Sequence, residues 1–104
     1  MKKRIAILGA GESGTGSAIL ASKMGFDVFV SDKCQIKDEY RQILVSRKIR
    51  FEEGGHTEKE ILRADEVIKS PGINEDEPLV LKIRGQGIPV ISEIEFAGRY
   101  SDGI

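Results

Sequence analysis

The run Ile5-Ala6-Ile7-Leu8-Gly9-Ala10-Gly11-Glu12-Ser13-Gly14 decides the fold of this chain. Its apolar first half is typical of a strand that is buried on both faces of a parallel sheet. The glycines that follow have the G-x-G-x-x-G spacing of a strand-to-helix turn. Such a turn presents backbone N–H groups and a helix N-terminus to an anionic ligand, usually a diphosphate. The alternative is a plain tight turn whose glycines only permit close packing.

Strand and helix patterns alternate along the rest of the sequence. Short apolar or β-branched runs predict five strands, over residues 4–8, 27–31, 50–53, 66–69 and 89–91. Periodic segments predict helices over residues 13–24, 38–48, 57–64, 78–85 and 92–100. Gly25 stands where a glycine commonly ends a helix. Thr57 and Ser92 each precede a glutamate by three residues, which is the spacing of a capping box at a helix start.

This alternation predicts an α/β fold, a Rossmann-like doubly wound sheet of five parallel strands with flanking helices in three layers. A sheet of this kind binds ligands at the carboxyl ends of its strands. Three loops are expected there, over residues 9–14, 31–34 and 70–73. The expected packed positions are Thr15, Ile19, Leu20 and Met24 in the first helix, and Tyr40, Ile43, Leu44 and Arg47 in the second.

In the first loop each residue has an expected role. Gly9 permits the tight turn, Gly11 lets the backbone approach a phosphate, and Gly14 lets helix and strand pack closely. Ser13 can cap the helix or donate its hydroxyl to the ligand. Glu12 is expected to point away, because an anionic side chain repels a diphosphate.

The second and third loops carry polar groups to the same edge. Asp32 lies 18 residues after Gly14, near the roughly 20 expected for the acid that binds the ribose in NAD proteins. An acid here can equally accept from a pyrimidine N–H, or cap the following turn. Lys33 can neutralise a phosphate or stay solvated. In Ser70-Pro71-Gly72, proline fixes the backbone and glycine allows a positive φ, so the turn is either a ligand wall or a plain turn.

Composition excludes several classes of function. The 104 residues are expected to form one domain, and a net charge of −1 gives no electrostatic footprint for nucleic acid or an anionic membrane. The apolar run that ends at Gly9 is too short for a signal peptide or a membrane span. Cys34, the one cysteine, excludes an internal disulfide and a cysteine-based zinc site and fits a reducing cytosol. His56, the one histidine, is interpreted as a loop residue without a metal role.

Taken together, the loops and their neighbours resemble the N-terminal domain of the Mur ligase family over nearly the whole chain. Four runs carry the resemblance: Ile7-Leu8-Gly9-Ala10-Gly11-Glu12-Ser13-Gly14, Val28-Phe29-Val30-Ser31-Asp32, Ile68-Lys69-Ser70-Pro71-Gly72-Ile73 and Gly87-Ile88-Pro89-Val90-Ile91-Ser92-Glu93-Ile94-Glu95-Phe96. The Ser-Pro-Gly turn points to the branch that adds D-glutamate. The resemblance implies a cytoplasmic, three-domain enzyme of peptidoglycan synthesis. Such an enzyme joins D-glutamate to UDP-N-acetylmuramoyl-L-alanine with ATP and magnesium.

The resemblance also implies roles for residues of this chain, whose domain would hold the uridine diphosphate end of the substrate. Glu12 and Ser13 would offer donors to the diphosphate, with Gly9, Gly11 and Gly14 shaping the loop. Asp32, Lys33 and Cys34 would meet the uracil, and Ser70, Pro71 and Gly72 would wall the uridine pocket. The family often has an apolar or basic residue in place of Glu12 and an arginine near Cys34. Those two contacts are therefore expected to be weaker or to use the backbone only.

No G-x-x-x-x-G-K-[ST] phosphate loop occurs in the sequence. Residues 1–104 are therefore expected to be an N-terminal domain separated from its ATP-binding central and C-terminal domains. We expect it to have no catalytic residues, no metal site and no activity alone. Two other classes stay open, an NAD-type dinucleotide-binding module and an interaction domain with a vestigial glycine turn.

Overall fold

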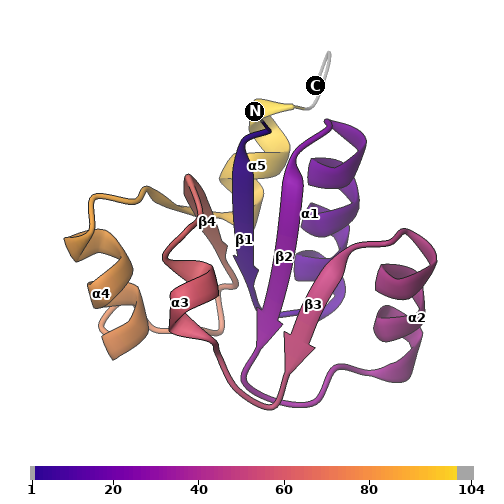
Figure 1. The fold of residues 1–104 in the computed structure, drawn as a ribbon, viewed down its shortest axis with the longest axis horizontal. Helices are drawn as coiled ribbons and strands as arrows, with labels where there is room; N and C mark the ends of the chain where they lie inside the picture. The colour runs from indigo at the N-terminus through magenta and orange to yellow at the C-terminus, as the bar shows by residue number, and fades with distance from the viewer. Residues whose placement is uncertain (1, 101–104) are drawn as a thin grey trace.

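The computed structural model of the protein describes residues 2–100 (Figure 1). Strands and helices alternate in the predicted order, with small shifts at their ends. They are β1 (Arg4–Leu8), α1 (Glu12–Lys23), β2 (Asp27–Asp32), α2 (Asp38–Ser46), β3 (Arg50–Glu53), α3 (Glu58–Ile61), β4 (Glu66–Lys69), α4 (Pro78–Gly85), β5 (Val90–Ser92) and α5 (Glu93–Arg99).

The strands form one parallel sheet in the order β3-β2-β1-β4-β5. The first strand is central and pairs with β2 on one side and β4 on the other. The chain therefore builds one half of the sheet, returns to the middle and builds the other half. The point between β1 and β4 is the switch in strand order, where doubly wound sheets bind their ligands.

Helices cover both faces of the sheet, which confirms the predicted three layers. One core contains Ile5 and Ile7 together with buried residues of α1, α2 and α5. The other contains Ala6 and Leu8 together with buried residues of α3 and α4. Successive side chains of a strand point to opposite faces, so the apolar run of β1 serves both cores. Figure 1 shows α3 and α4 on the opposite side of the sheet from α1.

The buried side of α1 differs in part from the predicted one. Thr15 is buried and Leu20 packs, half-buried, against the core as expected, but Met24 is 47% exposed. The fully buried residues of the helix are small, among them Ala18 and Ala21. The cause is close packing at Gly14, where an added Cβ would lie 1.9 Å from the carbonyl oxygen of Gly9. Only small side chains fit between a helix and a sheet at this separation.

The second helix ends earlier than predicted. Leu44 is fully buried as expected, whereas Arg47 is exposed, which corrects its placement on the packed side. Lys48 was predicted to be helical, but its φ of 59° is left-handed and lies outside the helix. A residue in this conformation is a common way to terminate a helix.

The two predicted capping boxes behave differently. The Ser92 side chain accepts a hydrogen bond from the Glu95 N–H at 3.0 Å, as predicted. Thr57 precedes α3 but does not cap it, because its hydroxyl donates to Glu52 instead. The third helix also ends at Ile61, short of the predicted residue 64. Within residues 2–100, none of the helices has the length and apolar character needed to cross a membrane.

Candidate functional site

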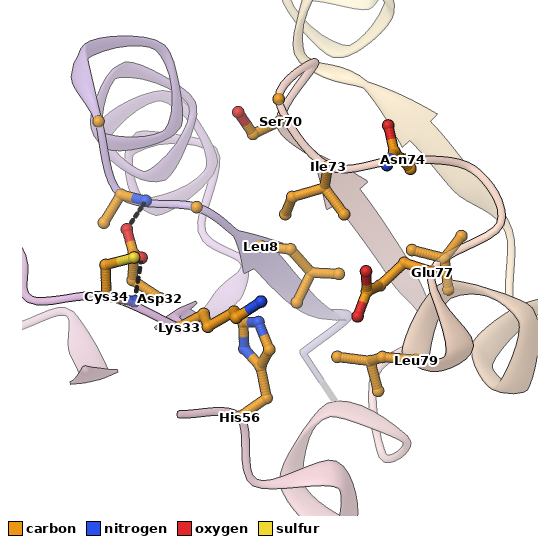
Figure 2. A pocket seen from close by; sticks show the side chains of 15 residues that line it. Leu8, Asp32, Lys33, Cys34, His56, Ser70, Ile73, Asn74, Glu77 and Leu79 are labelled. Atoms are coloured by element: carbon orange, nitrogen blue, oxygen red, sulfur yellow. Dashed lines mark hydrogen bonds between the residues drawn. The ribbon is translucent and has the colours of Figure 1, made fainter. Parts of the chain in front are cut away.

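A cavity of about 440 Å³ opens at the carboxyl edge of the sheet, over the switch between β1 and β4 (Figure 2). Small-molecule sites in proteins have roughly 300–1,000 Å³, so this cavity is large enough for one. The predicted site residues that line it are Gly9, Gly11, Asp32, Lys33, Cys34, Ser70 and Gly72. All three predicted loops therefore meet at one place.

The glycine loop lines the cavity and is held from two sides. Gly9 has a φ of +100°, and its N–H donates to the Ser31 carbonyl at 2.9 Å. A Cβ at Gly9 would lie 2.8 Å from the Ser70 Cβ, so glycine is required there for both conformation and space. Gly11 is the N-terminal cap of α1 and provides no side-chain cap for it. The first turn of α1 thus lacks a side-chain acceptor, a property of helix ends that bind anions.

Asp32 connects the glycine loop to the loop after β2. Its Oδ2 accepts from the Ala10 N–H at 2.8 Å, and its Oδ1 accepts from the Cys34 N–H at 2.9 Å. Figure 2 shows both bonds. The predicted alternative of a turn-capping aspartate is therefore part of its role. A carboxylate has about four acceptor positions, so either oxygen can still accept from a ligand.

The third loop is held by a buried lysine. Lys69 donates from Nζ to the Ile73 carbonyl at 2.6 Å and to the Ser70 carbonyl at 3.3 Å. Its ammonium also pairs with Glu75 at 3.2 Å. Gly72 was predicted to use a positive φ, but it does not adopt one, and the space around its Cα is open. The turn is therefore fixed by Lys69 and not by the conformational freedom of glycine.

Four predicted site residues do not line this cavity. Glu12 is exposed, in agreement with the expectation that it points away. Gly14 is buried beneath the loop against Gly9, and Pro71 is exposed on the third turn. Ser13 lies in a separate hollow between α1 and α5. Only backbone groups of Glu12 and Ser13 at the start of α1 are candidates for ligand contacts in the main cavity.

Sequence reasoning missed several residues of the cavity. The sequence predicts His56 only as a loop residue, yet its side chain lines the cavity, as do Asn74 and Glu77 before α4. The sequence holds one signal that could have placed His56 in the cavity. His56 follows Gly54-Gly55 directly after β3, so it stands at the same carboxyl edge of the sheet as the three loops. Figure 2 shows His56 and Glu77 among the side chains around the opening.

The His56 side chain is anchored beneath the cavity surface. Its Nδ1 lies 2.6 Å from the Ser31 hydroxyl oxygen, which in turn lies 2.7 Å from Glu52 Oε2. Burial acts to raise the pKa of Glu52, but hydrogen bonds from Thr57 and Ser31 outweigh it and lower that pKa. Glu52 is therefore a carboxylate at neutral pH.

Glu93 is a second perturbed carboxyl group. It is 7% exposed, and its Oε1 has no hydrogen-bond partner among the described residues. Burial raises the pKa of Glu93, and the nearby Ser13 hydroxyl and Lys69 charge only partly oppose this. Glu93 lies beside the hollow between α1 and α5 and is not part of the main cavity.

The strand order and the position of the cavity define the class as a Rossmann-like domain with a ligand-sized opening at its topological switch. Residues 4–79 match the family described as the MurD N-terminal domain. The chain belongs to this family.

Relatives agree with this assignment. Over 100 residues the chain is 66% identical to the UDP-N-acetylmuramoylalanine--D-glutamate ligase of Bacteroides thetaiotaomicron, covering 96% of this chain and 22% of that protein. The corresponding protein of Bacteroides fragilis is 63% identical with the same coverage. The solved structure of a type C pseudomurein peptide ligase from Methanothermus fervidus has a TM-score of 0.83 and 26% identity, covering 98% of this chain and 21% of that one. The chain thus spans about a fifth of the length of these relatives.

Proposed function

We propose that this chain is the part of a ligase that binds the UDP end of UDP-N-acetylmuramoyl-L-alanine, the substrate to which the enzyme adds D-glutamate. The observation that carries the proposal is the meeting of the three predicted loops around one cavity at the sheet switch. Family membership and the printed names of the relatives supply the substrate class. The cytoplasm, where nucleotide-linked precursors are made, is the proposed compartment.

The geometry supports a division of the cavity between diphosphate and uridine. The backbone of Gly9 and Gly11 and the N-terminus of α1 suit the diphosphate, because their N–H groups need no side chain to reach an oxygen. Asp32 and Lys33, at the end of β2, suit the uridine, Asp32 as an acceptor for the ribose hydroxyls and Lys33 as a donor to the carbonyl oxygens of the base. Ser70 stands on the opposite wall.

ATP and magnesium belong to the proposed reaction, in which ATP phosphorylates the alanyl carboxylate before D-glutamate attacks it. The residues of this chain do not fit that pair. The sequence has no G-x-x-x-x-G-K-[ST] loop, and within residues 2–100 no three His, Cys, Asp or Glu side chains are grouped to hold a metal ion. We therefore assign ATP, magnesium and D-glutamate to residues outside this chain and assign it no catalytic group.

An NAD-type module is the competing function, and Asp32 bears on it. In NAD proteins the acid at this position accepts from the ribose hydroxyls. Here each carboxylate oxygen already accepts a backbone N–H, from Ala10 or from Cys34. Acceptor positions remain on both oxygens, so Asp32 alone suits either ligand, and the family membership is what favours the UDP assignment.

A titration followed by two-dimensional NMR tests the proposal, with UDP as ligand and NAD as comparison. We expect saturable shifts with UDP at the amides of Gly9, Gly11, Asp32 and Gly72, and none with NAD. A few contacts less the cost of association give a Kd on the order of 0.1–10 mM for the chain alone. Shifts with NAD alone would support the dinucleotide module. Silence with both ligands at ~10 mM would remove the claim that this chain binds a nucleotide unaided.

A further inference from the structure

Three side chains form a relay beneath the cavity. His56 lines the cavity (Figure 2), and its Nδ1 lies 2.6 Å from the Ser31 hydroxyl oxygen. The same hydroxyl lies 2.7 Å from Glu52 Oε2. Ser31 is 0% exposed, so water does not compete for these bonds. The imidazole is therefore connected through one hydroxyl group to a carboxylate on β3.

The number of protons in this relay fixes the state of the imidazole. Glu52 also accepts from the Thr57 N–H at 2.7 Å and from the Thr57 hydroxyl, and a carboxylate can only accept. The Ser31 oxygen lies 2.7 Å from Glu52 Oε2, and only the hydroxyl can supply a proton between these two oxygens, so the one proton of Ser31 goes to Glu52. The Gly55 carbonyl, at 3.5 Å, is too far away to compete. Nδ1 of His56 must then donate to Ser31. The neutral ring consequently has its proton on Nδ1 and a lone pair on Nε2.

Nε2 has no hydrogen-bond partner within the part of the chain that the structure describes. We propose that His56 uses Nε2 to accept a hydrogen bond from a ring N–H of the bound ligand. This assignment rests on the proposed function, under which the donor is the imide N–H of uracil. Lys33 lines the same cavity and carries ammonium donors that suit the carbonyl oxygens beside that N–H.

The relay gives the cavity a preference between pyrimidines. Uracil presents N–H at ring position 3, whereas cytosine presents a lone pair there. A lone pair facing Nε2 leaves two acceptors opposed and unpaired. CDP is therefore expected to bind roughly 5- to 150-fold more weakly than UDP. His56→Ala should remove this preference, and Ser46→Ala, outside the cavity, should keep it.

Because the chain has a single histidine, its imidazole signals in a long-range ¹H–¹⁵N NMR spectrum need no assignment. In the free protein with a neutral imidazole, we expect Nδ1 to carry the proton and Nε2 to carry the lone pair. UDP should move the Nε2 signal, and CDP at equal concentration should move it less. Ser31→Ala removes the hydroxyl that accepts from Nδ1, so the neutral imidazole should become a mixture of its Nδ1-H and Nε2-H tautomers. If His56 only packed against the loop, the substitution would not change the tautomer.

The outcomes separate this proposal from the function on which it rests. A proton on Nε2 in the free protein overturns the relay, whatever the ligand does. An unmoved Nε2 signal while UDP shifts the amides of Gly9 and Gly11 overturns the role of His56 and leaves the proposed function standing. An absence of amide shifts with UDP at ~10 mM removes the claim that this chain binds a nucleotide unaided, and this assignment with it.

Discussion

Replacing Gly14 with alanine is the sharpest test of how α1 is seated on the sheet. The new Cβ would lie 1.9 Å from the carbonyl oxygen of Gly9 and 2.9 Å from its carbonyl carbon. Both neighbours are backbone atoms, so rotation of a side chain cannot relieve the contact. Either α1 or the glycine loop must move by about 1 Å or more to restore an ordinary separation.

Two opposing effects determine the size of the loss. Overpacking of a rigid site costs about 1–3 kcal/mol, and a backbone neighbour puts Gly14 at the upper end. Alanine returns about 1 kcal/mol through its higher helix propensity. The net loss of unfolding free energy is about 2 kcal/mol, or roughly 8–16 °C in Tm for a domain of this size.

Gly16→Ala is the matched control, since Gly16 lies in the same helix, is exposed and has nothing within 4 Å of an added Cβ. Gly16→Ala gains the helix propensity of alanine without a steric clash of its Cβ. The variant should be about 0.5–1 kcal/mol more stable than the original chain. Urea unfolding followed by circular dichroism measures both variants. If Gly14→Ala unfolds at the same urea concentration as Gly16→Ala, the close packing of helix and loop described above is wrong.

Three further substitutions test other parts of the structure. Ser92→Ala removes the cap of α5 and should cost about 1 kcal/mol in urea unfolding; an unchanged midpoint would show that the cap is dispensable. Lys69→Met leaves the Ile73 carbonyl without its donor and should cost about 1–3 kcal/mol and weaken UDP binding in the NMR titration; unaltered binding would separate Lys69 from the site. Glu93 has a raised pKa, so the folded state holds its proton more tightly than the unfolded state, and stability from this group is lost as pH rises from the ordinary carboxyl range through the raised pKa. Glu93→Gln should therefore stabilise the protein at pH 8 by on the order of 1 kcal/mol and by less at pH 4, and equal effects at both pH values would contradict the assignment.

Patterns that depend on neighbouring residues predicted most of the fold. The apolar run of β1, the glycine after α1 and Pro78 at the start of α4 each act within a few residues, so they could be interpreted without coordinates. The meeting of the three loops also followed from the rule that parallel strands end at one edge.

Features set by distant partners could not be predicted. The buried side of α1 depends on how closely Gly14 meets Gly9, and hydrophobic spacing carries no information on that distance. Thr57 follows a capping pattern, but Glu52 competes successfully for its hydroxyl. His56 joins the cavity only because β3 pairs beside β2, which places Ser31 within reach of its ring.

The Asp32 carboxylate has a consequence for the kinetics of association. It fastens the β1–α1 loop and the β2–α2 loop to each other through Ala10 and Cys34. The conformational entropy of these two loops is therefore lost when the chain folds, and ordering them does not subtract from the free energy of ligand binding. Under the proposed function, a nucleotide therefore meets two loops that are already ordered. Its association rate should be set by diffusion and orientation, and not by the closing of a loop.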